Sequence, residues 1–167
     1  IGIQWGIIMG AIFTLLLIIK RSAEPNIVEL GYVEKEQLFR DISRYPEANT
    51  SEEITMLRID SSIHFANIVF LQEKIKSFVQ RKHRTKYLIL DMSSVNDIDI
   101  VSISTLEEMI YEFQKGQGIT IYFIHVKGAI RDLMNKFGWD KKYSEQVNYE
   151  KVEQLLREKG VIPLLRL

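Results

Sequence analysis

The stretch that decides the fold runs from residue 87 to residue 100 and reads Tyr87-Leu88-Ile89-Leu90-Asp91-Met92-Ser93-Ser94-Val95-Asn96-Asp97-Ile98-Asp99-Ile100. Its first four residues form a short apolar run that stops at a carboxylate, as expected of a central strand covered on both faces. A polar loop with three carboxylates and two hydroxyls follows. In open α/β sheets, sites gather at the carboxyl ends of the strands. This loop is therefore the candidate functional site.

Two interpretations of the loop are open. Asp91, Asp97 and Asp99 could hold Mg²⁺ for phosphoryl transfer, because hard oxygen ligands suit that cation. Alternatively, Asp and Ser side chains accept hydrogen bonds from free backbone N–H groups and so cap turns and helix starts. We favour capping, since no glycine-rich phosphate loop follows any strand and no Lys or Thr at the usual phosphatase spacing completes the set.

The rest of the sequence argues against an enzyme. His64, His83 and His125 are far apart, and none has a His or Cys at metal-ligand spacing. There is no nucleophile elbow and no dinucleotide-binding motif. We therefore expect no catalytic residue, no metal and no cofactor.

Composition narrows the range of partners. The 167 residues include 22 basic and 22 acidic side chains, and zero net charge argues against nucleic acid as the main partner. The chain has no Cys, which excludes disulfides and thiolate metal sites and fits a reducing compartment.

Outward from the loop, strand patterns alternate with helix patterns. Extended segments are expected at residues 27–33, 54–59 and 119–124, and an irregular stretch with a helical turn at residues 34–50. This alternation predicts an α/β fold whose mostly parallel sheet has helices packed on it.

The expected helices have recognisable starts and ends. A helix capped by Asn67 should bury one apolar face, made of Val69, Phe70, Ile75, Phe78 and Val79. Ser104 and Glu107 form a capping box for the helix after the loop. Glycines should end this helix and two later ones, at Gly116 or Gly118, at Gly138 and at Gly160.

The first 19 residues are apolar, and every charged side chain lies at or after Lys20. A helix over this span is about 28 Å long, close to the hydrocarbon thickness of a bilayer. A signal peptide would carry its basic residues before the apolar run, whereas Lys20 and Arg21 follow it. A buried core helix would be shorter or show a polar stripe. We expect a transmembrane helix over residues 1–21. The remainder of the chain should lie in the cytosol, because basic residues next to a membrane span favour the cytosolic side of the membrane.

Gly2, Gly6 and Gly10 fall at four-residue intervals and line one face of this helix. Small residues so placed let a neighbouring helix approach closely, although Gly is also common in membrane helices generally. We favour a helix packed in a larger bundle, the last of a multi-spanning protein. Since the chain begins with Ile, we expect it to be a piece of something longer.

The loop also carries a resemblance to a known family. An apolar strand followed by Asp-x-Ser-x-Val and then an Asp opening a helix is similar to the signature of STAS domains, found in sulfate transporters and anti-sigma factor antagonists. The signature residues here are Asp91, Ser93, Ser94, Val95, Asp97 and Asp99. Two further segments resemble the transporter branch, the SulP permeases of solute carrier family 26: residues 57–67, which contain Phe65-Ala66-Asn67, and residues 30–46, which end in Tyr45-Pro46.

The resemblance implies a STAS-like mixed, mostly parallel sheet and a three-part organisation: residues 1–21 as the last transmembrane helix, 22–26 as a linker and 27–167 as a cytosolic STAS domain. It implies the regulatory and dimerisation domain of a secondary anion transporter for sulfate, bicarbonate, chloride or carboxylates. The implied partners are the membrane domain of the same transporter, a second copy, the lipid bilayer of the cell membrane and regulatory proteins.

The sequence departs from the family at one point. Anti-sigma factor antagonists carry Ser-Ser-Gly after the aligned Asp, whereas Ile100-Val101-Ser102 follows Asp99 here. A phosphorylation switch at that position is therefore not expected. Ser93, Ser94, Ser102 and Ser104 remain possible phosphate acceptors at the same edge of the sheet, but capping explains them more simply. The alternative function is a membrane-tethered domain that senses a nucleotide or transfers a phosphoryl group, with a nucleotide as its cofactor.

Overall fold

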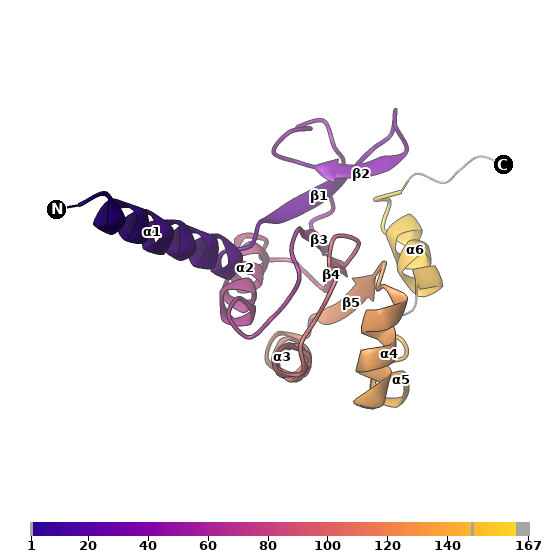
Figure 1. Ribbon diagram of the computed structural model, residues 1–167. Helices are drawn as coiled ribbons and strands as arrows, with labels where there is room; N and C mark the ends of the chain where they lie inside the picture. The colour runs from indigo at the N-terminus through magenta and orange to yellow at the C-terminus, as the bar shows by residue number, and fades with distance from the viewer. Residues whose placement is uncertain (1, 148, 163–167) are drawn as a thin grey trace.

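The computed structural model describes residues 2–147 and 149–162 (Figure 1). Residue 1, where the expected membrane helix begins, and residues 163–167, where the expected cytosolic domain ends, lie outside the described residues. The elements, in chain order, are α1 (Ile3–Ala23), β1 (Ile27–Val33), β2 (Leu38–Asp41), β3 (Ile54–Ile59), α2 (Ile68–Arg81), β4 (Tyr87–Asp91), α3 (Ile100–Glu112) with a π-helical turn η1 (Phe113–Gln117), β5 (Thr120–Ile124), α4 (Gly128–Lys136), α5 (Trp139–Lys142) and α6 (Tyr149–Glu158).

Helix α1 projects away from the rest of the molecule (Figure 1), and none of its 21 residues is buried. Within the described residues it is the one helix long and apolar enough to cross a membrane. It ends at Ala23 because Pro25 disfavours helical backbone at Glu24, whose φ and ψ are −118° and 72°. The helix therefore continues two residues into the expected linker, and only residues 24–26 separate it from β1.

The five strands form one mixed sheet in the order β2-β1-β3-β4-β5. Strands β3, β4 and β5 pair in parallel, whereas β1 is antiparallel to both of its neighbours. Four strands thus share one direction and only β1 opposes them. The expected mixed, mostly parallel sheet is confirmed. Its interior strand β4, paired with β3 on one side and β5 on the other, is the apolar run next to the polar loop.

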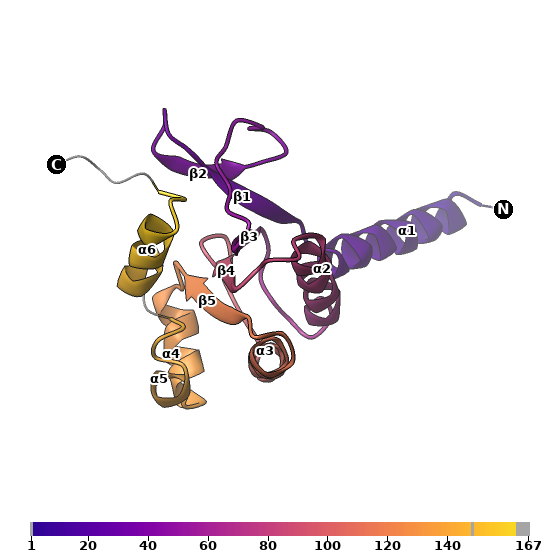
Figure 2. The same ribbon diagram turned by 180° about the vertical axis from the view of Figure 1, so that it is seen from behind.

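Side chains alternate between the two faces of the sheet, and each face has its own cover. Leu88 and Leu90 of β4 belong to the larger core, beneath α2, α3, α4 and α5. Ile89 points the other way, into a smaller core whose only helical members in the described chain come from α6. Figure 2 shows α6 apart from α2 and α3, across the sheet. The second face is therefore covered more thinly than the first.

The sequence patterns did not predict two of the elements, β2 and α5. Residues 38–41, expected to be irregular, form the edge strand β2, whose Leu38 is 51% exposed. The short helix α5 was not expected either, and its Trp139 is among the largest fully buried side chains. An edge strand has one free side and needs little apolar alternation, so pairing with β1 decides its conformation.

The helices occur where expected, with corrections at their starts. The expected burial of Ile75 and Val79 in α2 is confirmed, whereas Phe70 and Phe78 are only partly buried and Val69 is 60% exposed. The buried face of α2 consists of Ile68, Leu71, Ile75 and Val79. The capping box is wrong: α3 begins at Ile100, and the Ser104 hydroxyl donates to the Ile100 carbonyl one turn earlier. The expected ends are confirmed at Gly118, Gly138 and Gly160, all with positive φ, which glycine adopts without strain.

Candidate functional site

The signature loop, residues 91–99, connects the carboxyl end of β4 to the start of α3. Its apolar members anchor it, since Met92 and Val95 are fully buried and the Val95 N–H donates to the Met92 carbonyl over 3.0 Å. The Met92 N–H donates to the carbonyl of Ile124 at the end of β5. The loop is thus held to the sheet by its apolar residues, and its polar residues are left to make specific contacts.

Asp91 is buried, and one of its oxygens, Oδ1, accepts two hydrogen bonds of 2.9 Å. One comes from the backbone N–H of Ser93, a local turn contact, and the other joins Nδ1 of His125. His125 follows β5 directly, where Ile124 is in register with Asp91. Its φ of +55° is unusual for a residue other than glycine. This backbone conformation holds the imidazole against the carboxylate.

Asp99 caps α3 and ties it to a distant segment. Its Oδ1 accepts from the N–H of Ser102 over 2.8 Å, and its Oδ2 accepts from the N–H of Phe65 over 2.7 Å. Burial is the largest single influence and raises the pKa of Asp99, but the hydrogen bonds from Ser102 and Phe65 together hold this pKa below its usual value. The side chain is therefore an ionised clamp between α3 and the segment before α2.

The three carboxylates of the loop do not converge. Asp91 faces His125, Asp99 faces Ser102 and Phe65, and Asp97 accepts from the N–H of Ile98 over 3.0 Å. Within residues 2–147 and 149–162, no group of three His, Cys, Asp or Glu side chains could hold a metal ion. The geometry gives the Mg²⁺ hypothesis no support, and each carboxylate has the capping or turn contact that the alternative predicted.

The loop serines differ in accessibility. Ser93 is exposed and Ser94 half-buried, whereas Ser102 is fully buried within α3. A hydroxyl sealed in the core is out of reach of a kinase. Ser102, which follows Asp99 by three residues, therefore packs in the core and is not accessible for phosphorylation.

A second polar cluster joins α1 to the rest of the chain. Asn67, which is fully buried, donates from Nδ2 to the carbonyls of Ser22 and Ser62 and accepts from the N–H of His64. The hydroxyl of Ser22 lies 3.1 Å from Nε2 of His64. Since Phe65 contacts Asp99, this junction cluster (Ser22, His64 and Asn67) leads from the end of α1 to the signature loop.

Asn67 does not cap α2 with its side chain, contrary to the expectation. Its role in the junction was missed because its partner Ser22 is 45 residues away. The pairing of His125 with Asp91 was missed for the same reason, although one signal was present. Both residues stand at the carboxyl ends of neighbouring strand patterns, and such ends meet at one edge of a parallel sheet.

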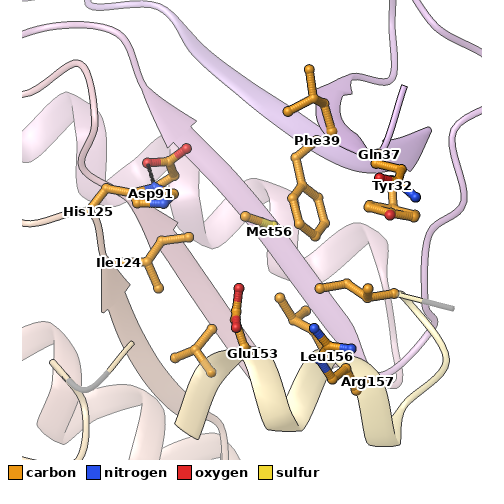
Figure 3. A pocket seen from close by; sticks show the side chains of 13 residues that line it. Tyr32, Gln37, Phe39, Met56, Asp91, Ile124, His125, Glu153, Leu156 and Arg157 are labelled. Carbon is orange, nitrogen blue, oxygen red and sulfur yellow. Dashed lines mark hydrogen bonds and ion pairs between the residues drawn. The ribbon is translucent and has the colours of Figure 1, made fainter. Parts of the chain in front are cut away.

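A pocket of about 410 Å³ opens on the thinly covered face of the sheet, between the strands and α6 (Figure 3). Met56 and Ile124 lie on its sheet side, and Phe39 and Tyr32 of the β1–β2 hairpin form a wall, with ring centroids 5.3 Å apart. Asp91 and His125 stand at one end. The polar loop thus contributes to this pocket through Asp91, while its other carboxylates serve elsewhere.

Gly2, Gly6 and Gly10 lie at the start of α1 and along one side of it. A Cβ built on any of the three would meet no atom within 4 Å. Among the described residues nothing covers this face, so it is accessible to a neighbouring helix.

Comparisons with known proteins identify the family of the chain and relatives of similar sequence. A sequence profile of the STAS domain family matches residues 45–154. Among curated proteins, sulfate transporter 4.1, chloroplastic, of Arabidopsis thaliana is 33% identical over 123 residues, covering 68% of this chain and 18% of that protein. The probable sulfate transporter 4.2 of the same plant is 34% identical over 130 residues, covering 72% of this chain and 19% of that protein. The chain thus spans less than a fifth of the length of these relatives.

Solved structures support the fold. The murine solute carrier 26 family member A9 anion transporter, in its inward-facing state, superposes with a TM-score of 0.72 at 20% identity, covering 85% of this chain and 23% of that one. A sulfate transporter family protein from Wolinella succinogenes superposes with a TM-score of 0.53 at 21% identity, covering 71% of this chain and 99% of that one.

Proposed function

This chain belongs to the STAS domain family, and we propose that it forms the cytosolic regulatory and dimerisation domain of a SulP-type secondary anion transporter, together with that transporter's last membrane helix. Its relatives are named as sulfate transporters, which supports an anion of the sulfate, bicarbonate, chloride or carboxylate class as the transported substrate. The role is non-enzymatic. The working membrane domain belongs to the part of the protein that this chain does not include.

The junction cluster is the observation that carries the proposal. Helix α1 has apolar side chains and no buried residue, so a lipid environment is the one that suits it. Its last turn is nevertheless hydrogen-bonded to the domain through Ser22, His64 and Asn67. A shift of α1 would act on these bonds and, through Phe65, on Asp99 at the start of α3. Such a connection suits a domain that responds to, or restrains, a membrane helix.

The proposed boundaries follow from the same features. Residues 1–21 cross the bilayer of the cell membrane, residues 22–26 form the linker, whose Ser22 belongs to the junction cluster, and residues 27–167 form the domain. Lys20 and Arg21 in the last turn of α1 favour the cytosolic side for the junction and the domain. Gly2, Gly6 and Gly10 offer a face for a neighbouring helix of the membrane domain. The same face could pack against a helix of a second copy, which supports assembly into a homodimer.

The alternative, a domain that senses nucleotides or transfers phosphoryl groups, depends on Asp91, Asp97 and Asp99 acting together. Each of the three has a separate backbone or imidazole partner. No contact of these residues favours the alternative, and we do not adopt it.

Removal of residues 27–167 from the intact transporter tests the proposal. We expect less dimer by cross-linking and a lower anion flux into proteoliposomes at equal protein. The point variant Asn67→Ala should reduce flux in the same direction, because it cuts the junction but keeps the domain. Asn135→Ala, an exposed substitution on α4, is the matched control. Unchanged dimerisation and flux after the deletion would refute the proposal.

A further inference from the structure

We propose that the pocket between the sheet and α6 binds a free amino acid with an apolar or aromatic side chain. This inference does not depend on the transporter proposal, because binding to the pocket can be measured whatever the domain regulates. It rests on three features of the pocket: its size and apolar floor, a pair of opposite charges on α6, and a fixed polar end.

The size and floor select a small ligand with an apolar body. About 410 Å³ lies at the lower end of the range of small-molecule pockets, which is roughly 300–1,000 Å³. Met56 and Ile124 lie on the floor, and Phe39 stands over it from the β1–β2 hairpin (Figure 3). An aromatic or branched aliphatic group would bury its surface between Phe39 and Met56.

The α6 side of the pocket carries both signs of charge. Val152 and Leu156 turn toward the sheet and are buried, while Glu153 and Arg157, one helical turn apart, line the pocket beside them and are half-buried. Figure 3 shows the Glu153 carboxylate directed into the pocket, with Arg157 next along the helix. Side chains so spaced on a helix are neighbours, with Cβ atoms about 5–6 Å apart. An ammonium at Glu153 and a carboxylate at Arg157 can therefore belong to one small zwitterion.

The opposite end of the pocket is fixed. The Asp91–His125 pair is held by a 2.9 Å hydrogen bond and by the positive φ of His125. Strained backbone of this kind persists where the surrounding structure imposes it, and it gathers at binding sites. The pair sets the length of the apolar floor, because a side chain longer than that floor would meet a polar wall.

Three probes with the same phenyl group separate the contributions of charge. Phenylalanine carries both charges, phenethylamine only the ammonium and 3-phenylpropionate only the carboxylate. Binding of each is measured by isothermal titration calorimetry to the full chain in lipid nanodiscs. We expect phenylalanine to bind about tenfold more tightly than either single-charge probe, the factor for one charge-assisted hydrogen bond.

Two variants on α6 then assign the charges. Arg157→Gln should abolish the advantage of phenylalanine over phenethylamine, and Glu153→Gln should abolish its advantage over 3-phenylpropionate. Lys151→Gln and Glu158→Gln make the same charge changes on α6, but their side chains contact Glu145 and Gln154 instead of the pocket, so they should bind phenylalanine like the parent chain. No binding at millimolar phenylalanine, equal affinity for the three probes, or α6 variants that match their controls would overturn the proposal.

Discussion

Replacement of Asp99 by alanine is the sharpest test of the structure. This side chain joins two segments 34 residues apart, because it accepts from the N–H of Ser102 in α3 and from the N–H of Phe65 before α2. Alanine removes both acceptors and leaves two backbone donors without their partner. The change adds no bulk, so any loss of stability reports on these two hydrogen bonds.

The two bonds give the expected size of the effect. Loss of an N-cap side chain costs about 1 kcal/mol, and loss of a hydrogen bond to a charged group costs roughly 1.5–3 kcal/mol. The free energy of unfolding should therefore fall by about 3 kcal/mol, a large share of the 5–15 kcal/mol typical of a domain. Asp99→Asn retains one acceptor oxygen and should cost about half as much.

The effect should also depend on pH. The pKa of Asp99 is lower in the folded chain than its usual value, so its carboxylate stabilises the fold fully above that usual value. This stabilisation is lost as the pH falls through the folded pKa. The difference between the parent chain and Asp99→Ala should then shrink below about pH 4.

Urea unfolding at pH 7 and pH 3 measures both effects, followed by the fluorescence of the buried Trp139 in a Trp5→Phe background that removes the tryptophan of α1. Asp97→Ala is the matched control, since that carboxylate accepts only from the N–H of its neighbour Ile98 among the described contacts. If Asp99→Ala costs no more than Asp97→Ala at pH 7, or if its cost is the same at both pH values, the clamp interpretation is wrong.

Three further predictions follow from single contacts. In Gly31→Ala the new Cβ would lie 2.8 Å from Cβ of Ala48, so the melting temperature should fall by an amount equivalent to about 1–3 kcal/mol, whereas Gly116→Ala, with open space around it, should be tolerated. Trp139→Ala empties a fully buried site and should cost about 3–5 kcal/mol in urea unfolding followed by circular dichroism, against less for Trp139→Phe. Hydrogen bonds from Lys86 and Lys159 lower the pKa of Glu53 to about 2, so the contact of Lys159 with Glu53 should persist above the usual pKa of Glu53 and be lost as the pH falls toward 2. The protection of amides near Gly160 against exchange, relative to their intrinsic rate at each pH, should therefore fall over that interval in the parent chain and not in Glu53→Gln.

The sequence by itself determined the elements whose signal is local. The apolar run of β4, the helix ends at Gly118 and Gly138, and the charge-free stretch of α1 before Lys20 follow from residues within one segment. Burial of one face, free rotation at glycine and the absence of charge are properties that a short stretch carries with it. The alternation of these elements was enough to predict an α/β sheet with the polar loop at its edge.

Tertiary structure decided which of these elements meet. Strand β2 exists because β1 pairs with it, although its own residues carry little strand signal. Asn67 reaches Ser22 across 45 residues, and His125 reaches Asp91 across 34. Such contacts depend on strand order and on which face of the sheet each side chain occupies, and a one-residue shift in register would reverse every face. For this reason the sequence placed the signature loop correctly, but the junction cluster and the pocket beside α6 emerged only when distant segments were packed together.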